Sequence, residues 1–338
     1  MGFFNKIIYW INIIVAFLLL ISFVLPYVPP KSFPTLSLLS LIVSPLILIN
    51  ILFFVYYAIR LKRKLIISLI VLLIAHLHFN PFFEFSSEKN SADYNNTLHV
   101  LSYNVRLFNA YEKNPSKDVS IIISEILNIQ QPDVICIQEY YNDNKMDFSG
   151  YPYSFIHFND GKGIFGHAIF SKYPLLNKGA FDFKDSNNNT IYVDIVKGDD
   201  TLRIYNLHLQ SLGITPGIIS WQEGKKDKLI KRISRTFIIQ QQQMEDILDH
   251  KNTSPNPVLL CGDFNNTPFS YVYRRLRGDM KDAFVECGNG IGTTYLFDSY
   301  PMRIDYILVS KELDVVKFET VKKSFSDHYP VSATVGWD

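Results

Sequence analysis

Polar side chains that could bind a cation or move a proton interrupt the apolar runs of this 338-residue sequence, mostly where a run ends. A carboxylate or an amide at the end of a buried strand is costly to bury unless a ligand or an ion uses it. Six short segments contain such groups: LSYNVR, VICIQEY, YNLHLQ, LLCGDFN, RIDYILV and SDHYP. The candidate site residues in them are Asn104, Glu139, His208, Asp263, Asn265, Asp305, Asp327 and His328.

These residue types suit the hydrolysis of a phosphate ester. Four carboxylates and two amides without a thiol form a set of hard oxygen ligands, which favours Mg²⁺ or Mn²⁺ over zinc. The two imidazoles are then free to move a proton or to hold an oxyanion. Hydrolysis of a phosphate ester needs a cation, an oriented water and donors for the charge that develops, and this set offers each part.

The elements that must position these residues begin near Leu98. Short runs rich in β-branched and aromatic residues predict strands over residues 98–104, 133–139, 167–172, 191–197, 201–209, 257–264, 303–309 and 329–335. Apolar spacing and charge predict helices over residues 119–127, 225–248 and 271–277. The alternation indicates an α/β domain with a substantial sheet core. Positions two apart share a strand face, so Asp263 and Asn265 should point together, whereas Tyr205 should point away from His208.

The motifs GDFN, RIDYI and SDHYP, in this order and downstream of an Asn and a Glu at strand ends, resemble the endonuclease/exonuclease/phosphatase superfamily. That superfamily includes DNase I-like nucleases, abasic-site endonucleases, sphingomyelinases and inositol polyphosphate 5-phosphatases. The resemblance covers about residues 98–336. It implies a four-layer sandwich, in which two β-sheets are flanked by helices and the site lies at one end between the sheets.

The resemblance also implies which residues hold the metal ion. Glu139 is expected to be the principal metal-binding carboxylate, and Asn104 beside it to hold either the metal or the phosphate. Asp327 resembles a second carboxylate that faces the metal. Where many nuclease members carry an acidic residue, two positions after Asn104, this chain has Arg106. That change removes a candidate ligand, leaves open whether one or two metal ions bind, and offers a cation that could hold the phosphate.

The remaining roles concern the water and the phosphate. The resemblance implies that Asp263 orients and deprotonates the attacking water, and that Asn265 steadies the water and the phosphate. His328 is expected to contact the scissile phosphate, with Asp305 holding its imidazole in the charged form. His208 is expected either to donate to a nonbridging oxygen or to protonate the leaving group.

The first 83 residues differ from the rest in being apolar and nearly free of charge. Residues 7–28, 35–59 and 65–83 are predicted to be transmembrane helices, since about 20 apolar residues cross a hydrocarbon core. The third segment is the shortest, and His76 and His78 stand near its end. The polar residues 84–97 are predicted to be a linker, and residues 98–338 the catalytic domain.

The orientation in the membrane follows from the loops. Arg60, Lys62, Arg63 and Lys64 separate the second and third segments, whereas only Lys31 lies between the first and second. The positive-inside rule therefore places the N-terminus in the cytoplasm and, after three crossings, the catalytic domain on the extracytoplasmic side. The membrane is expected to be a plasma or inner membrane. If the third segment lies only in the interface, the domain is cytoplasmic instead.

The sequence leaves the substrate open. The net charge of +1 gives no sign of a nucleic-acid partner, but Lys225 to Arg235 and Arg274 to Arg277 are locally basic. These cations could bind a nucleic-acid backbone, bind anionic lipid headgroups, or simply form a solvated helix face. The predicted reaction is the hydrolysis of a phosphodiester, or of a phosphomonoester, by in-line attack of the water that Asp263 activates. The substrate is either a nucleic acid or a phospholipid. The alternative is a catalytically inactive, membrane-tethered scaffold or binding protein on the same fold. Nothing in the sequence indicates an obligate protein partner.

Overall fold

The computed structural model describes residues 3–79, 83–112, 118–142, 146–158, 163–184, 186–214 and 226–338. The chain forms two compact units. The helical unit contains Met1–Phe82, Gly224–Gln241 and Asn266–Arg275, and the sheet unit contains Phe83–Glu223, Gln242–Asn265 and Leu276–Asp338. Lys225 and the end of the third apolar segment, residues 80–82, lie outside the described residues.

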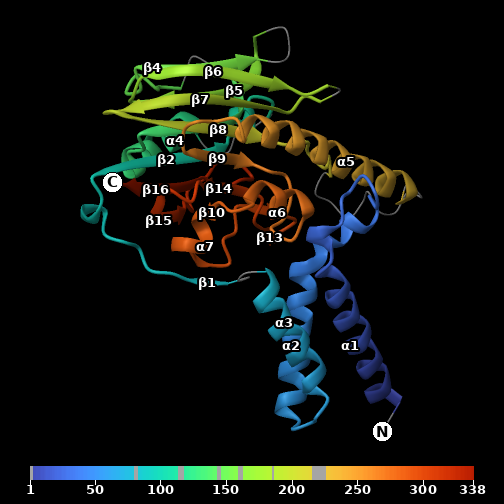
Figure 1. Cartoon of the computed structure of the whole chain (residues 1–338). Coiled ribbons are helices and arrows are strands. Elements are labelled where there is room, and N and C mark those ends of the chain that lie inside the picture. The colour runs from blue at the N-terminus through green and yellow to red at the C-terminus, as the bar shows by residue number, and fades with distance from the viewer. Residues whose placement is uncertain are drawn as a thin grey trace. The chain divides into compact units, whose positions relative to one another are not determined.

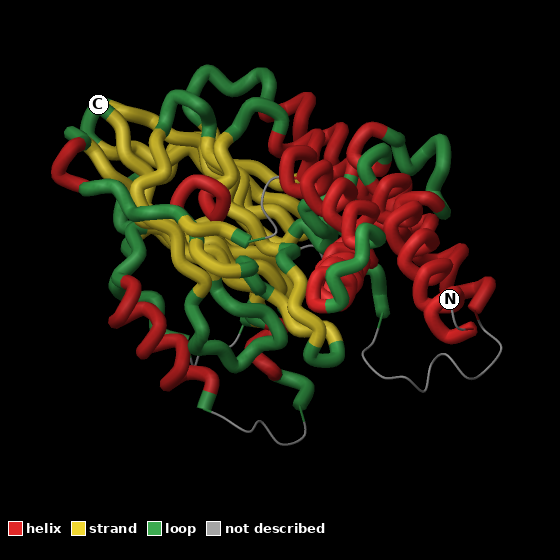
Figure 2. Tube along the Cα trace, turned by 90° about the horizontal axis from the view of Figure 1, so that it is seen from below, coloured by secondary structure: helices red, strands yellow, loops and turns green. Residues whose placement is uncertain are grey.

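The sheet unit is built on two six-stranded sheets, whose strands are labelled in Figure 1 and drawn as yellow tubes in Figure 2. One sheet has the order β15 (Asp314–Thr320), β16 (Val331–Trp337), β2 (Asn96–Asn104), β3 (Val134–Tyr141), β5 (Phe165–Ser171) and β4 (Tyr153–Phe158). The other has the order β10 (Lys281–Asp282), β14 (Asp305–Val309), β9 (Val258–Asp263), β8 (Asp200–His208), β7 (Asn189–Lys197) and β6 (Leu175–Asp182). Two small antiparallel pairs complete the strands: β1 (Glu84–Phe85) pairs with β11 (Asn289–Gly290), far along the chain, and β12 (Tyr295–Phe297) forms a hairpin with β13 (Tyr300–Met302).

Alternation along the central strands explains the layers. In β2, Leu98 and Val100 belong to the apolar cluster between the two sheets, while Leu101 and Tyr103 belong to the cluster under α4 (Val119–Gln130). Because successive strand residues point to opposite faces, both faces of this sheet are buried. The same parity places Asn104 on the inter-sheet face, at the end of the strand.

Other helices complete the unit. The second half of α5 (Lys226–Lys251) contributes the buried Met244 and Ile247, and Tyr205 of β8 forms a hydrogen bond with His250 Nδ1 at 2.7 Å. Tyr205 thus points toward the helix, away from the inter-sheet face, as its parity predicts. The short helix α7 (Ala283–Cys287) follows β10, whereas α6 (Tyr271–Arg277), which follows β9 along the chain, belongs mostly to the helical unit.

The segment that the sequence presents as a linker is bound along the sheet unit. Glu84 and Phe85 pair with β11, the Ser86 N–H donates to Gly288 O at 3.2 Å, and the Lys89 N–H donates to Val316 O at 2.8 Å. The Tyr94 hydroxyl donates to Asp314 at 3.1 Å. The segment is therefore a strap fixed to the sheet unit.

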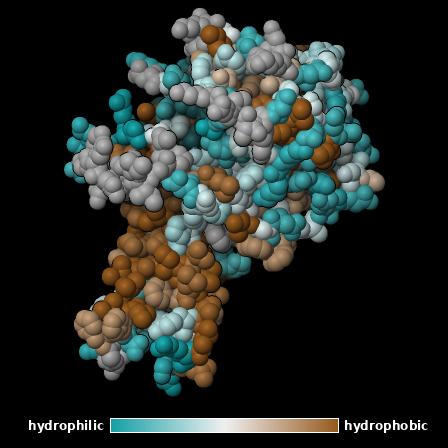
Figure 3. Space-filling model, turned by 180° about the vertical axis from the view of Figure 1, so that it is seen from behind, coloured by the Kyte–Doolittle hydropathy of each residue, from teal (hydrophilic) through white to brown (hydrophobic). Residues whose placement is uncertain are grey.

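The helical unit contains α1 (Phe3–Ser22), α2 (Val43–Ile59) and α3 (Leu65–Phe79), with short 3₁₀ turns at Leu25–Tyr27 and Leu36–Ile42. The stretches Phe3–Tyr27 and Leu36–Ile59 are long and apolar enough to cross a membrane, whereas α3 has 15 residues. Brown, hydrophobic atoms cover the outside of these helices in Figure 3. Polar groups lie inside instead, where Ser68 donates to Asn12 Oδ1 at 2.8 Å and both residues are fully buried.

The two ends of these helices have different neighbours. At one end, Arg274 lies 4.1 Å from the Tyr27 ring centroid, the Lys31 N–H donates to Gln241 at 2.8 Å, and the Thr267 hydroxyl donates to Ser40 O at 2.9 Å. At the other end, Lys64 lies 4.1 Å from the ring centroid of Tyr9. The first loop, α6 and the first part of α5 therefore meet at one end of the helices, and the basic loop between α2 and α3 lies at the other.

Candidate active site

Five strands bring candidate residues to one edge of the sandwich. In the parallel pairs, Asn104 of β2 lies opposite Gln138 of β3, and His208 of β8 lies opposite Asp263 of β9. Asp305 begins β14, which runs antiparallel to β9 and pairs Asp305 with Asp263. A residue at the start of an antiparallel strand thus reaches the same edge as residues at the ends of the parallel strands.

Asn104 links two carboxylates. Its Nδ2 donates to Glu139 Oε1 at 3.2 Å and to Asp263 Oδ2 at 3.1 Å, while its Oδ1 accepts the Arg106 N–H at 3.0 Å. The side chain is 1% exposed. In this orientation the amide positions the two acids, and it would have to turn over to offer its oxygen to a metal ion.

Glu139 stands on a distortion of β3. The pairing with β5 shifts between Ile137 and Tyr140, and Glu139 has a φ of +52°. A left-handed non-glycine residue costs about 1–3 kcal/mol, which the surrounding structure must offset. The irregular pairing leaves the side chain 32% exposed at the edge. Burial raises the pKa of the Glu139 carboxyl, while the Asn104 hydrogen bond and the charge of His328 lower it.

Asp263 is the most enclosed acid of the group, at 1% exposure. Its Oδ1 accepts the Asn265 N–H at 2.7 Å, and its Oδ2 accepts Asn265 Nδ2 at 3.1 Å in addition to the Asn104 amide. Gly262 allows β9 to approach β8, because a Cβ at that position would lie 2.0 Å from Leu207 O, and its φ is +138°. Burial raises the pKa of the Asp263 carboxyl well above its ordinary value.

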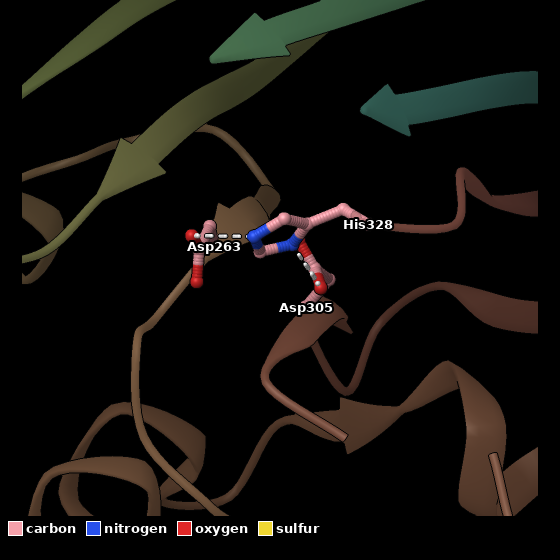
Figure 4. Close-up of side chains that lie close together, drawn as sticks. All are labelled: Asp263, Asp305 and His328. Atoms are coloured by element: carbon pink, nitrogen blue, oxygen red, sulfur yellow. Dashed lines mark hydrogen bonds and ion pairs between the residues drawn. The ribbon is translucent and has the colours of Figure 1, made fainter. Parts of the chain in front are cut away.

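His328 lies between two acids, as Figure 4 shows. Its Nδ1 is 3.0 Å from Asp305 Oδ2, and its Nε2 is 3.7 Å from Asp263 Oδ2. Burial by itself lowers the pKa of the imidazole, but the charges of Asp305 and Asp263 outweigh burial and raise the pKa to about 10. The imidazole is therefore a buried cation at neutral pH.

His208, in contrast to His328, is neutral. Its Nε2 lies 3.7 Å from both Glu139 Oε1 and Asp263 Oδ2. Burial, followed by the positive charge of His328, lowers the pKa of His208 to about 3. The site thus holds one charged and one neutral imidazole on two sides of Asp263.

Arg106 and Asp327 lie at the rim. The Arg106 guanidinium is 4.0 Å from Asp327 Oδ2 and 2.8 Å from Glu112, and Asp327 is 39% exposed. Four consecutive residues, Arg106 to Asn109, have φ between +46° and +56°. This left-handed turn is fixed by the buried Phe108 and by the bond from Asn109 Nδ2 to Phe325 O at 3.0 Å. Asp327 forms no hydrogen bond or ion pair with the described side chains of Glu139, Asp263 or His328. Its charge nevertheless raises the pKa of Glu139.

A buried polar chain supports the edge from behind. Gln138 Nε2 donates to Asn206 Oδ1 at 2.6 Å, which joins the two sheets, and to Ser102 Oγ at 3.1 Å. Asn206 Nδ2 donates to the carbonyls of Ile137 and Ala168. Sequence reasoning missed these residues, but their signal was present, since Ser102 and Asn206 share strand faces with Asn104 and His208.

Two further neighbours have no such signal. The Thr294 hydroxyl accepts the Asp305 N–H at 3.1 Å, and the Tyr295 ring lies 4.8 Å from the ring of His328. His167, whose role the sequence left open, is 2% exposed, and its ring lies 5.4 Å from that of His208. Thr294 and Tyr295 are brought in by the β12–β13 pair, which the sequence pattern did not reveal.

The donors present fit a hard divalent cation. The ligand atoms of Asp263, Asp305 and His328 lie within 4.8 Å of one another, but the raised pKa of His328 favours a proton on that ring over a metal bond. Glu139 instead offers a partly exposed carboxylate beside the buried Asp263. Carboxylate and amide oxygens are the ligands that Mg²⁺ prefers. Of the described residues, Glu139 is therefore the best placed to hold the ion.

Comparison with known proteins bears on the family and the fold of the chain. A sequence model described as the Endonuclease/Exonuclease/phosphatase family matches residues 101–328, and one described as a domain of unknown function matches residues 5–82. No curated protein matches the chain.

Solved structures share the fold. An endonuclease/exonuclease/phosphatase family protein from Bacteroides thetaiotaomicron is 20% identical with a TM-score of 0.53, covering 72% of this chain and 98% of its own. The human Nocturnin catalytic domain with bound sulfate is 18% identical, with a TM-score of 0.52 and coverages of 72% and 95%. D. rerio TDP2 complexed with a single strand DNA product is 15% identical, with a TM-score of 0.53 and coverages of 72% and 100%. These similarities confirm the predicted sandwich of two sheets flanked by helices.

Proposed function

The chain belongs to the Endonuclease/Exonuclease/phosphatase family, and on that premise we propose that it is a divalent-metal-dependent phosphoesterase anchored in a membrane. The observation that carries the proposal is the His328 imidazolium held between Asp305 and Asp263, at the edge where Asn104 joins Asp263 to Glu139. Burying this many ionisable groups is unfavourable unless they are used, which argues against an inactive scaffold.

The residues divide the work as follows. Glu139, with Asp327 at the rim as a second carboxylate, would hold a divalent cation, which when bound would supply positive charge to the phosphoryl oxygens. Asp263 holds the attacking water and takes its proton when the carboxyl is ionised, and burial, which raises its pKa, makes that carboxylate a stronger base than an exposed one. Hydrogen bonds from Asn104 and Asn265 fix this carboxylate before the substrate arrives.

The two imidazoles serve the phosphate. His328 remains charged and offers its Nε2–H to a phosphoryl oxygen, while Asp305 holds the ring through Nδ1. His208 is neutral, so of the two roles left open for it we assign donation to a nonbridging oxygen. A group with a pKa of about 3 holds no spare proton for a leaving group at neutral pH. Arg106, 49% exposed at the rim, supplies a further cation for the substrate.

The anchor is supported by the arrangement of the N-terminal helices. Trp10 and Phe17 of α1 are 61% and 59% exposed, whereas the polar Asn12 and Ser68 are buried. A water-soluble helical bundle has the reverse distribution, so this surface suits lipid. We propose that α3 completes three crossings and that the sheet unit lies on the extracytoplasmic side of a plasma or inner membrane.

The charge of the sheet unit favours a small or lipid-borne ester over a long polynucleotide. By sequence, the sheet unit contains nineteen basic and thirty-one acidic residues. Affinity for nucleic acid comes mainly from cations that replace the counterions of the phosphate backbone. An acidic unit is poorly suited to that mode of binding.

The test is an assay of the full chain purified in detergent. Phosphoinositides, sphingomyelin, plasmid DNA, RNA and a chromogenic phosphodiester are offered with Mg²⁺, with EDTA, and to the His328→Ala variant. We expect turnover of a lipid or small ester that EDTA abolishes and that the variant loses by at least 100-fold. Equal turnover in EDTA would refute metal dependence, and DNA cleavage that falls steeply with salt would overturn the substrate assignment.

A further inference from the structure

The charges of the chain are strongly segregated between its two units. By sequence, the helical unit contains fourteen basic residues and a single acidic one, Asp227. The same unit contains both stretches that are long and apolar enough to cross a membrane. Lipid-facing helices and an excess of cations therefore belong to one compact body.

Four of these cations form a face of α5. Lys228, Lys231, Arg232 and Arg235 are all exposed, and their spacing of three and four residues places them on one side of the helix. The buried residues of the same segment, including Ile233 at 5% and Phe237 at 1%, lie on the other side. We call these four residues the cationic face.

Contacts within the helical unit place this segment with one end of the apolar helices. Gln241 accepts the Lys31 N–H at 2.8 Å, and Gln240 accepts Asn266 Nδ2 at 2.8 Å. Arg274 and Arg275 of α6 belong to the same unit, and Arg274 covers the Tyr27 ring. Arg60, Lys62, Arg63 and Lys64 follow α2 at the opposite end, where Lys64 covers Tyr9. Cations therefore flank both ends of the apolar helices.

We propose that the cationic face binds anionic lipid headgroups of the membrane that holds α1 and α2. The inference rests on the anchor in the proposed function but not on catalysis. Anionic headgroups are the occupant that charge complementarity and location favour, because a helix tied to the end of a membrane-spanning bundle is held near the headgroup layer. Asp227 is the one acidic residue of the helical unit by sequence, so little negative charge near the cationic face would repel anionic headgroups.

The experiment uses the full chain in lipid nanodiscs made of phosphatidylcholine alone or with 30% phosphatidylglycerol. The test variant combines Lys228→Gln, Lys231→Gln, Arg232→Gln and Arg235→Gln. The control removes four exposed charges from the sheet unit: Lys172→Gln, Lys311→Gln, Lys317→Gln and Lys323→Gln. Thermal unfolding is followed by tryptophan fluorescence.

We expect phosphatidylglycerol to raise the Tm of the wild type by several degrees, and 0.5 M NaCl to remove most of that rise. The test variant should lose at least half of the rise, and the control should keep it. A test variant with the full rise would overturn the proposal. If the fourfold variant does not fold, the double variant Lys231→Gln, Arg235→Gln should lose a corresponding part.

Two further readouts separate the alternatives. Extraction with alkaline carbonate reports on the anchor alone, since wild-type protein released from vesicles would refute the membrane anchor rather than this surface. Binding of a 30-nucleotide single strand to wild type in phosphatidylcholine discs reports on the rival occupant. If the test variant loses that binding while its response to phosphatidylglycerol is unchanged, the face serves nucleic acid and the proposal is wrong.

Discussion

Replacing Asp305 with asparagine removes the charge that holds His328 while keeping the size of the side chain. The carboxylate oxygens of Asp305 lie 3.0 and 3.1 Å from His328 Nδ1, and Asp305 is 3% exposed. Asparagine can still accept a hydrogen bond from Nδ1, so the ring should stay in place. The variant therefore tests the charge on the imidazole rather than its position.

The magnitude follows from the pKa of His328. A rise from the ordinary 6.5 to about 10 corresponds to about 5 kcal/mol of stabilisation of the charged form. Asp263 supplies part of that rise, so we expect Asp305→Asn to reduce the free energy of unfolding by about 2–4 kcal/mol. Because the folded pKa is raised, this stability is fully present below pH 6.5 and is lost as the pH increases through about 10. The variant should therefore be most destabilised relative to wild type below pH 6.5.

Two assays follow from this. Thermal unfolding between pH 5 and 10 should show a Tm loss that shrinks as the pH rises. At pH 7, kcat should fall roughly 10²- to 10⁴-fold, and the limb of the pH profile on the basic side should move to lower pH. The control is Asp194→Asn, which breaks the buried pair with Arg203 at 2.7 Å. The pKa of Asp194 is lowered, so its contribution to stability is constant across this range. If Asp305→Asn keeps the wild-type kcat and pH profile, the reasoning about His328 is wrong.

Three further changes test other parts of the account. Glu139→Gln should raise the Mg²⁺ concentration needed for half-maximal activity at least tenfold, as a metal titration would measure, because it removes the best-placed carboxylate ligand; an unchanged titration would contradict that assignment. Gly262→Ala should lower the Tm by several degrees through the clash with Leu207 O, whereas Gly150→Ala, with no atom within 4 Å of the added carbon, should not. A reporter fused after Phe85 should be active only outside the cytoplasm, and activity confined to the cytoplasm would refute the three-span topology.

Most of the sheet unit follows from patterns in the sequence. All eight expected strands are present, because runs such as 98–104 and 191–197 are buried on both faces and read as apolar. Of the strands in the two six-stranded sheets, β4, β6, β10 and β15 were missed. In β4 and β6 no residue is buried, so their side chains need not be apolar or alternate. The strap at residues 84–97 was also missed, since its contacts are mainly backbone and single side-chain hydrogen bonds that composition does not encode.

The candidate site residues that could be predicted are the polar side chains that the sequence places within or next to buried apolar strands. Asn104, Asp263 and His328 stand out because each interrupts or follows an apolar run, and the structure brings them together. The charge states could not be read from the sequence. Both imidazoles lie 3.7 Å from Asp263 Oδ2, but only His328 also has Asp305 at 3.0 Å, and the resulting charge on His328 helps to lower the pKa of His208. Tyr295 could not be selected as a site residue from the sequence either, because its position depends on the short β12–β13 strand pair near the C-terminus.

The most direct measurement is the turnover of Asp263→Asn against wild type, on whichever ester the full chain hydrolyses in Mg²⁺. Asparagine keeps the shape of the side chain but cannot take a proton from water. We expect kcat to fall by roughly 10³-fold or more, with Mg²⁺ affinity reduced far less and the protein still folded. A variant that turns over within tenfold of wild type would show that Asp263 is not the base and would contradict the account.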